Sequence, residues 1–296
     1  MEYNVIKVSN AQNKEKIYSY LRRIGYSENY IKNLRKKEGY ILKNDQVAHS
    51  DYYVNDNDIL KLCKNPNTTT GIMLCTIPLN IVYEDDDVLV VNKPSGISIS
   101  PSKSHYTENM SGAILSYMIK KDPNFVVRIV GRLDMETCGL FVVAKHSVIS
   151  SKLSLDKQLI SKVYYAIVTG SIDENIVIDK NIDTSIGNKG YNDRKRIISD
   201  SGKPAITYVS PVLFDGNNTL CRITIEHGRT HQIRLHLSSI NHPLLGDSLY
   251  GVSSDRISHT ALICKELKIV NPFTNKEIAL SVDFPDDFKN AFNVEL

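Results

Sequence analysis

Short apolar runs with strand character, separated by turns, dominate the sequence from about residue 77 onward. The clearest strand-like runs are 88–91, 140–144, 164–168, 206–209 and 220–225. Segments with helical spacing are fewer, and they cover residues 111–120, 147–159 and 231–239. Because the strands do not alternate regularly with helices, a doubly wound parallel sheet is excluded. The pattern predicts an α+β fold with a large mixed, mostly antiparallel sheet flanked by helices and loops.

The first 66 residues have a different pattern, which predicts a small separate α/β domain. Its expected elements are helices over 13–24 and from Ser27 onward, strands at 40–42 and 59–62, and a turn at 44–45. Residues 65–71 contain both Pro and Gly and show no apolar periodicity, so they indicate a linker. The predicted organisation is an N-terminal domain at 1–66, a linker at 67–76 and a larger domain at 77–296.

Positive charge is concentrated in the N-terminal domain. The whole chain has a net charge of +3, whereas residues 1–66 hold 12 basic and 8 acidic side chains. Eight of the basic residues lie within 14–37, and Lys32, Arg35 and Lys36 are among them. A local basic patch suits a phosphate backbone, although a solvated helix face is the more common origin of a charge run taken alone.

Several protein classes are excluded by what the sequence lacks. No apolar run approaches the ~18 to 20 residues of a membrane-spanning helix, and the N-terminus has no signal peptide, so we expect a soluble cytoplasmic protein. The five cysteines are scattered and form no CxxC pair, which argues against a disulfide framework or a zinc ribbon. Neither a GxGxxG nor a P-loop motif is present, so no nucleotide cofactor is expected.

Two segments place polar side chains next to predicted strands. Asp134 lies in GRLDMETCGL, just before the strand at 140–144. A loop carboxylate at this position is a candidate nucleophile or general base, although a turn Asp that bonds local backbone N–H groups is the commoner case. In SKVYYAIVTG, strand alternation sends Tyr164 and Tyr165 to opposite faces. One tyrosine can therefore lie in the core while the other stacks on a ligand.

The segment from Glu226 to Gly251 is the richest in Gly, Arg and His. His231 and His236 are five residues apart and no acidic ligand completes a set, so a zinc site is not expected. If the chain is helical from about residue 230, Arg234 lies one turn into the helix, and the preceding turn points donors at an anion or a carboxylate. Because unpaired burial of an arginine is unfavourable, we expect Arg234 to have a carboxylate partner.

Taken together, these segments resemble the RluA-type family of RNA pseudouridine synthases. The similar blocks, in family order, are VNKPSG at 91–96, GRLDMETCGL at 131–140, KVYYAIVTG at 162–170, GKPAIT at 202–207, GRTHQIRLHL at 228–237 and HPLLGDSLYG at 242–251. The resemblance covers roughly residues 78–285, and the joint occurrence of the blocks is highly specific. The N-terminal domain is similar, more loosely, to the small RNA-binding domain named after ribosomal protein S4.

The resemblance implies a pseudouridine synthase fold and roles for particular residues. Asp134 is implied as the essential catalytic residue, Tyr164 as the active-site tyrosine and Arg234 as the basic partner of Asp134. Arg132 resembles the residue that fills the gap left by a flipped base. The other implied RNA contacts are Leu133, Thr137, Arg229, His231 and Gln232 in the large domain, and Lys32, Arg35 and Lys36 in the N-terminal domain.

Two residues depart from the family pattern. Gly131 stands where the family usually has His, and Cys138 stands where it usually has Ser. These departures put the local packing and the capture of the target loop in question, but they do not touch Asp134, Tyr164 or Arg234. We expect Cys138 to be a buried, inert thiol rather than an oxidant-sensitive one.

The residue types fit the implied reaction. Turning uridine into pseudouridine breaks the bond from ribose to the base nitrogen and joins carbon 5 of the uracil to the same sugar carbon, so no atom is gained or lost and no cofactor or metal is required. The carboxylate of Asp134 either attacks the anomeric carbon or takes a proton from the neighbouring sugar carbon, and pairing with Arg234 would keep it ionised and oriented. The uridine must first be flipped out, which costs a few kcal/mol. Tyr164 offers a face for the uracil and a hydroxyl that can move the carbon-5 proton.

Other interpretations remain beside this one. Large-subunit ribosomal RNA is the better guess for the substrate because of the N-terminal domain, but transfer RNA is open and the target uridine cannot be read. A catalytically silent RNA-binding or ribosome-assembly factor would predict erosion of the catalytic residues, yet all three are in place. A sugar hydrolase that uses Asp134 and Glu136 fails, because two carboxylates two residues apart in a loop do not flank a glycosidic bond. We expect a monomer.

Overall fold

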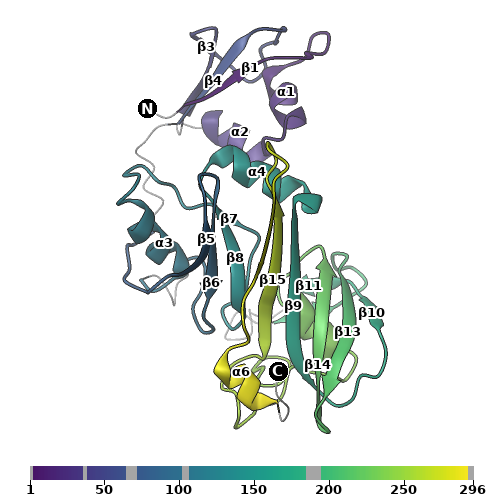
Figure 1. Ribbon diagram of the computed structural model, residues 1–296. Coiled ribbons are helices and arrows are strands. Elements are labelled where there is room, and N and C mark those ends of the chain that lie inside the picture. Colours follow the sequence, from purple (N-terminus) through teal and green to yellow (C-terminus); the bar gives the residue numbers. More distant parts are fainter. Residues whose placement is uncertain (1–2, 36–38, 65–71, 102–106, 185–194, 293–296) are drawn as a thin grey trace.

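The computed structural model describes residues 3–35, 39–64, 72–101, 107–184 and 195–292 (Figure 1). Within these ranges the chain forms a four-stranded sheet near the N-terminus, a large sheet of ten strands, and a two-stranded sheet made of β11 (Ile182–Thr184) and β12 (Arg196–Ile198). No helix in the described ranges is long and apolar enough to span a membrane.

The N-terminal domain is an antiparallel sheet in the order β1-β4-β2-β3 that is covered by two short helices. Its elements are β1 (Tyr3–Lys7), α1 (Ile17–Arg23), α2 (Glu28–Arg35), β2 (Gly39–Lys43), β3 (Gln46–Ala48) and β4 (Ile59–Lys64). The Oγ of Ser27 accepts the backbone N–H of Tyr30 at 3.2 Å, so the predicted cap of α2 is confirmed. Asn44 and Asp45 both have positive φ, as a two-residue hairpin turn requires, and they join β2 to β3. Residues 65–71, the core of the predicted linker, lie outside the described residues.

The large sheet has the strand order β10-β13-β14-β9-β15-β8-β6-β5, with β16 paired to β15 and β7 paired to β8. Its strands are β5 (Asn80–Glu84), β6 (Val88–Lys93), β7 (Ile129–Val130), β8 (Cys138–Ala144), β9 (Ile160–Thr169), β10 (Ile176–Asp179), β13 (Ile206–Phe214), β14 (Asn218–Glu226), β15 (Leu262–Val270) and β16 (Glu277–Ser281). The helical segments are α3 (Met110–Met118), α4 (Ser147–Leu155), the 3₁₀ turn η1 (Lys157–Leu159), α5 (Gln232–Ser238) and α6 (Asp286–Ala291). Among the described strand pairs only β8 and β15 are parallel, so the predicted mixed, mostly antiparallel sheet is confirmed.

The centre of the large sheet is apolar on both sides. All seven residues of β8 are buried, because the main core packs on one side of the sheet while a smaller cluster that includes Phe288 of α6 covers the other. Gly139 has φ +103, and a Cβ there would lie 2.3 Å from the carbonyl oxygen of Cys264 on β15. Glycine at this position therefore lets β8 approach β15 directly after the loop that carries Asp134.

Helix α4 of the large domain contacts the N-terminal domain. The side-chain amide of Asn4 donates to the Oγ of Ser147 at 3.2 Å, and Val148 packs against the N-terminal core. Figure 1 shows α4 between the N-terminal helices and the edge of the large sheet. The C-terminal half of the same helix contributes Leu153 and Ser154 to the cavity described next. The N-terminal domain is therefore attached to one wall of that cavity.

Candidate active site

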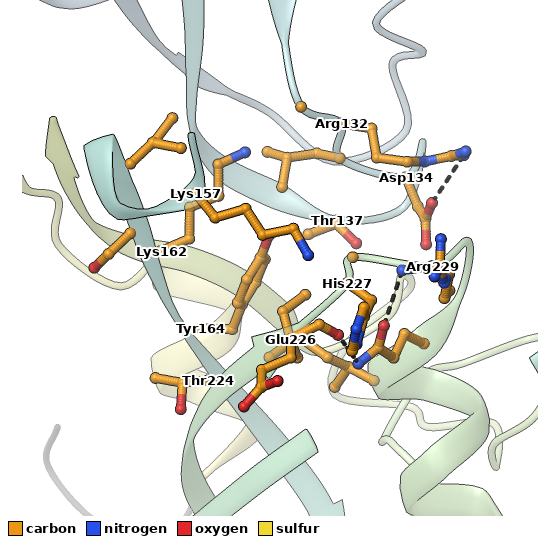
Figure 2. Close-up of a pocket in the computed structure, with 18 of the residues that line it drawn as sticks. Arg132, Asp134, Thr137, Lys157, Lys162, Tyr164, Thr224, Glu226, His227 and Arg229 are labelled. Atoms are coloured by element: carbon orange, nitrogen blue, oxygen red, sulfur yellow. Dashed lines mark hydrogen bonds and ion pairs between the residues drawn. The ribbon is translucent and has the colours of Figure 1, made fainter. Parts of the chain in front are cut away.

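A cavity of about 930 Å³ opens where three parts of the large domain meet. Its walls come from the loop between β7 and β8, from the chain running from α4 through η1 into β9, and from the end of β14 with the turn that leads into α5. All predicted site residues of the large domain line it, namely Arg132, Leu133, Asp134, Thr137, Tyr164, Arg229, His231, Gln232 and Arg234. The fold brings together the three segments that the sequence singled out (Figure 2).

The loop that carries Asp134 is tied to the turn after β6. The buried ammonium of Lys93 donates to the carbonyl oxygen of Met135 at 2.8 Å, and it also donates to two carbonyl oxygens of its own turn. The Oγ of Ser95 donates to the carbonyl oxygen of Glu136 at 2.7 Å. These bonds fix the loop on two strands of the sheet, and they hold Asp134 at the cavity with 14% of its side chain exposed.

Lys93→Met should therefore loosen the Asp134 loop. Three carbonyl oxygens would lose their donor, so we expect the free energy of unfolding at pH 7 to fall by about 2 kcal/mol. Misplacement of the carboxylate should lower kcat by about 10- to 100-fold. Steady-state kinetics and urea unfolding would measure both effects, with exposed Lys268→Met on β15 as the matched control. An unchanged kcat would show that the bond to Met135 does not position Asp134.

Lys93 should also make the free energy of unfolding of the wild-type protein depend on pH. Burial lowers the pKa of Lys93 from 10.5 to about 8. Between about pH 8 and pH 10.5 Lys93 is therefore protonated in the unfolded chain and largely deprotonated in the folded chain. The contribution of this group to the free energy of unfolding should therefore rise with pH over that window. Urea unfolding from pH 7 to pH 10 should show this component in the wild type and not in Lys93→Met.

Arg132 is the ion-pair partner of Asp134. Its Nη2 lies 3.4 Å from Oδ1 of Asp134, and its Nη1 donates to Oγ1 of Thr230 at 2.8 Å. The side chain of Arg132 is 56% exposed, so this long ion pair contributes little free energy. The guanidinium can therefore leave Asp134 at small cost when a ligand enters the cavity.

The predicted pairing of Arg234 with Asp134 is wrong. The guanidinium of Arg234 is bidentate on Asp247, with Nε to Oδ2 at 2.7 Å and Nη2 to Oδ1 at 2.6 Å, and both side chains are fully buried. No ion pair joins Arg234 to Asp134, although both residues are in the described part of the chain. The expected carboxylate partner exists, but it follows Arg234 by 13 residues in the HPLLGDSLYG segment. Arg234 lines the cavity as one half of a neutral, rigid pair.

Backbone hydrogen bonds also hold the carboxylate of Asp247 in this buried ion pair. Oδ1 of Asp247 also accepts the backbone N–H groups of Leu249 and Tyr250 at 2.8 and 3.1 Å. Burial by itself would raise the pKa of Asp247, but the hydrogen bonds and the charge of Arg234 outweigh it and lower that pKa below 3.8. Asp247 is thus ionised at neutral pH, and it fixes the first turn of α5 against the 247–250 turn.

Tyr164 lies on β9 with its ring in the cavity wall and 6% of its surface exposed. Its neighbour Tyr165 points to the other face, where it contacts Phe284 and donates to Glu266 at 2.9 Å. The predicted division of the two tyrosines is confirmed. Burial, and then the charges of Cys264 and Asp134, raise the pKa of Tyr164 well above its usual value. Tyr164 is a neutral phenol that can donate a hydrogen bond at neutral pH.

The turn before α5 is shaped by Gln232. The side-chain amide of Gln232 donates to the carbonyl oxygens of Ile206 and Glu226, and its oxygen accepts the backbone N–H of Arg229 at 2.8 Å. Its polar atoms are therefore already bonded within the protein, and Gln232 positions the turn. The contact of Gln232 with RNA stays a prediction.

Two histidines belong to the same turn. His231 caps α5 with φ +57, and its Nδ1 lies 3.0 Å from the hydroxyl of Tyr250. Burial lowers the pKa of His231 and outweighs the nearby charge of Asp134, which raises it, so the imidazole is neutral at pH 7. His227 has φ +76, which is strained for a side chain other than glycine, and its buried Nδ1 has no hydrogen-bond partner among the described residues.

Several cavity residues were not predicted, chiefly Lys157, Lys162, Glu226 and His227. Lys162 is the first residue of the KVYYAIVTG block, and strand alternation places it on the same side of β9 as Tyr164. That signal was available in the sequence. Lys157 lies in the short η1 turn before β9, and nothing in the sequence distinguishes it from a solvated surface lysine.

None of the described basic residues of the N-terminal domain lines the cavity. Lys32 is paired with Glu28 one turn earlier in α2, at 2.6 Å, and Arg23 is paired with Glu15 at 2.7 Å. These two basic side chains therefore already have counter-ions within the domain, although its net positive charge is unchanged. The side chain of Arg35 and the whole of Lys36 lie outside the described residues.

Cys138 and Gly131, the two departures from the family pattern, lie in different surroundings. Cys138 is 4% exposed, and burial raises its pKa to about 12, so it is the inert thiol that we expected. Gly131 borders the cavity with φ +76, which few other residues adopt.

Comparisons with known proteins show which family the chain belongs to. A family model described as RNA pseudouridylate synthase matches residues 87–239. The uncharacterized RNA pseudouridine synthase YjbO of Bacillus subtilis is 29% identical over 94% of this chain and 99% of its own length. Ribosomal large subunit pseudouridine synthase D of Haemophilus influenzae is 34% identical over 73% of this chain and 71% of its own length.

A solved structure shows the same fold. Human RNA pseudouridylate synthase domain containing 1 has a TM-score of 0.54 and 26% sequence identity, and the match covers 70% of this chain and 84% of that one. The matched family model covers the segments that carry Asp134, Tyr164 and Arg234. The chain therefore belongs to the RNA pseudouridylate synthase family, and it is an RluA-like enzyme of the type that isomerises uridine to pseudouridine in RNA.

Proposed function

We propose that this enzyme modifies specific uridines of large-subunit ribosomal RNA, with Asp134 as the catalytic carboxylate. The observation that carries the proposal is the placement of Asp134 and Tyr164 in the walls of one cavity. Preference for ribosomal over transfer RNA is supported by relatives that are named ribosomal large subunit pseudouridine synthase D. The proposed enzyme acts as a cytoplasmic monomer without a cofactor.

The proposed reaction begins when the target uridine leaves the RNA stack and enters the cavity. The guanidinium of Arg132 is held by weak bonds, so it can release Asp134 and occupy the vacated place in the RNA. The carboxylate then acts on the sugar, either as a nucleophile on the anomeric carbon or as a base at the neighbouring carbon. Charge that develops around it is compensated by the cations of the cavity wall, while the ion pair of Arg234 and Asp247 keeps that wall rigid.

Tyr164 is proposed to act on the uracil. Its ring offers a flat apolar surface to the detached base while the base rotates. Its hydroxyl stays protonated at neutral pH, because burial raises its pKa. Once carbon 5 has joined the sugar, the proton on that carbon must leave, and the hydroxyl of Tyr164 is positioned to relay it.

Tyr164→Phe keeps the aromatic ring and removes the hydroxyl. We expect kcat to fall by about 100-fold if the hydroxyl relays the proton, with little change in RNA affinity. Tyr164→Ala should in addition weaken binding of the flipped base, at a cost of about 1 to 3 kcal/mol. Single-turnover kinetics with filter binding would separate the two effects. A Tyr164→Phe enzyme with the wild-type rate would limit Tyr164 to stacking.

RNA outside the cavity is proposed to contact the N-terminal domain. That domain sits on α4, and α4 also forms part of the cavity wall, so one RNA can reach both. The basic residues of α1 and α2 would add sequence-independent contacts to phosphates. The similarity of this domain to an S4-type RNA-binding domain supports this part of the proposal.

The substrate can be tested by mapping pseudouridines in unmodified RNA. Purified enzyme is incubated with transcripts of large-subunit ribosomal RNA and, separately, with pooled transfer RNA transcripts, and carbodiimide-dependent stops of reverse transcription are mapped. Discrete stops in the ribosomal RNA are the expected result. Stops in transfer RNA alone would overturn the substrate assignment, and stops in neither would favour a catalytically silent RNA-binding factor.

A further inference from the structure

Two cationic side chains in the cavity wall have no ion-pair partner among the residues that the structure describes. The cavity is lined by five cationic side chains, which are Arg132, Lys157, Lys162, Arg229 and Arg234, and by two anionic ones, Asp134 and Glu226. Arg132 bonds Asp134 and Thr230, Arg234 is neutralised by Asp247, and Nε of Arg229 donates to the carbonyl oxygen of Pro204 at 3.1 Å. No hydrogen bond or ion pair joins the side-chain ammonium of Lys157 or Lys162 to another residue in the part of the chain that the structure describes.

Lys162 is the more informative of the two, because Gly131 makes the space for it. A Cβ built on Gly131 would lie 3.2 Å from Nζ of Lys162, which is tighter than ordinary van der Waals contact. Gly131 also has φ +76, so a side chain there would be strained in any case. In Figure 2, Lys162 and Lys157 extend from the wall opposite Asp134 and Arg132. The Lys162 ammonium thus lies directly beside the backbone of Gly131, where a side chain at residue 131 would crowd it.

We infer that Lys162 binds a phosphate of the flipped nucleotide in the gap that Gly131 leaves open. This inference rests on the proposed function and adds a substrate-binding residue to the same cavity. Lys162 lies two residues before Tyr164 on the same side of β9, so it is on the wall where the base would stack, and the phosphate of that nucleotide would lie toward the Asp134 loop.

A phosphate is the ligand group that fits this cation. Lys162 is half-buried in the cavity wall, and burial lowers its pKa more than the opposing charge of Cys264 raises it. A partly buried ammonium without an ion-pair partner is stabilised by a ligand that brings the counter-charge. Uracil and ribose are neutral, so the phosphate groups are the anions that an RNA substrate carries. Contacts of this kind supply the free energy needed to hold a nucleotide out of its stack.

The test measures the affinity of target RNA over a range of salt concentrations for wild type, Lys162→Met and Lys162→Arg. Losing one phosphate contact should weaken binding about tenfold near 0.1 M salt and reduce the slope of log K against log salt by about 0.7 to 0.9. Lys162→Arg keeps the charge and should keep the slope. Lys268→Met, at an exposed ion pair on β15, is the matched control and should behave as wild type.

A double-mutant cycle tests the link to Gly131. Gly131→Ala should weaken binding about as much as Lys162→Met, and it should add nothing in the Lys162→Met background. Gly216→Ala is the backbone control, since Gly216 has φ +96 in the exposed turn between β13 and β14 and a Cβ there meets no atom within 4 Å. Equal thermal stability of the variants confirms that they fold.

The outcomes separate this inference from the proposed function. Unchanged affinity and slope for Lys162→Met would overturn the inference, and so would weaker binding with an unchanged slope, which would assign Lys162 to a neutral atom of the base or sugar. Additive effects of Gly131→Ala and Lys162→Met would overturn the role of the gap. Turnover by Asp134→Asn would overturn the proposed catalytic role instead, and it would leave the binding measurements valid.

Discussion

Asp134→Asn should abolish turnover while the protein stays folded and binds RNA. An amide has nearly the same shape as the carboxylate, but it can neither attack a sugar carbon nor accept a proton from one. We expect kcat to fall by about ten-thousand-fold or more, as when an essential nucleophile or base is removed. The long bond to Arg132 is the one ion pair of Asp134 in the described structure, so its loss changes stability little.

Glu136→Gln is the control for Asp134→Asn. It removes the same charge from the same loop, two residues away, and should leave kcat close to wild type because the hydrogen bond from Ser95 that anchors the loop goes to the backbone carbonyl oxygen of Glu136, which Gln keeps. Initial rates of pseudouridine formation and RNA affinities for the three proteins give the answer. Measurable turnover by Asp134→Asn would remove Asp134 from the mechanism, whereas a loss of turnover in both variants would point to the charge of the loop.

Asp247→Ala should be the most destabilising single change at the cavity. It leaves the guanidinium of Arg234 buried without a counter-charge, and breaking a buried ion pair in this way typically costs about 3 to 5 kcal/mol. It also removes the acceptor for the backbone N–H groups of Leu249 and Tyr250. Urea unfolding would measure the loss. Glu277→Ala breaks the exposed pair with Lys268, and as the matched control it should cost less than about 1 kcal/mol.

The pair also predicts a dependence on acid. Because the pKa of Asp247 is lowered in the folded protein, its stabilisation is complete above the unfolded value of 3.8 and is lost as pH falls through the folded value. In Asp247→Asn this acid-dependent component should be absent. A small effect of Asp247→Ala at pH 7, below about 1 kcal/mol, would mean that water reaches Arg234 and that the pair is not a rigid support.

Local structure was predictable where a few neighbouring residues decide it. Ser27 as a helix cap, the Asn44 and Asp45 turn, and the opposite orientations of Tyr164 and Tyr165 follow from short-range rules. The positions of the cavity residues were predictable through the family resemblance, because its blocks carry them. The meeting of the three segments in one cavity depends on the strand order of the large sheet. The segments belong to β8, β9 and β14, and in that order β14 is next to β9 while β15 lies between β9 and β8.

The partners of charged residues were not predictable in the same way. The burial argument required a carboxylate for Arg234, but it could not choose between Asp134 and Asp247, because that choice depends on how the 247–250 turn folds back on α5. The charge count of the N-terminal domain did not show which basic side chains are paired internally, as Lys32 is with Glu28. The free ammonium of Lys162 depends on the backbone conformation of Gly131, which no pattern in the sequence gives.

The purified chain alone should isomerise uridine in RNA, and release of tritium from carbon 5 of uracil measures this reaction. Joining carbon 5 of uracil to the sugar displaces the hydrogen on that carbon, so RNA made with 5-tritiated uridine releases label into water when pseudouridine forms. With large-subunit ribosomal RNA, a metal chelator and no added nucleotide, we predict release that reaches a whole-number plateau per RNA molecule and is absent with Asp134→Asn. Absence of release by the wild-type protein, on ribosomal and transfer RNA alike, would contradict the account.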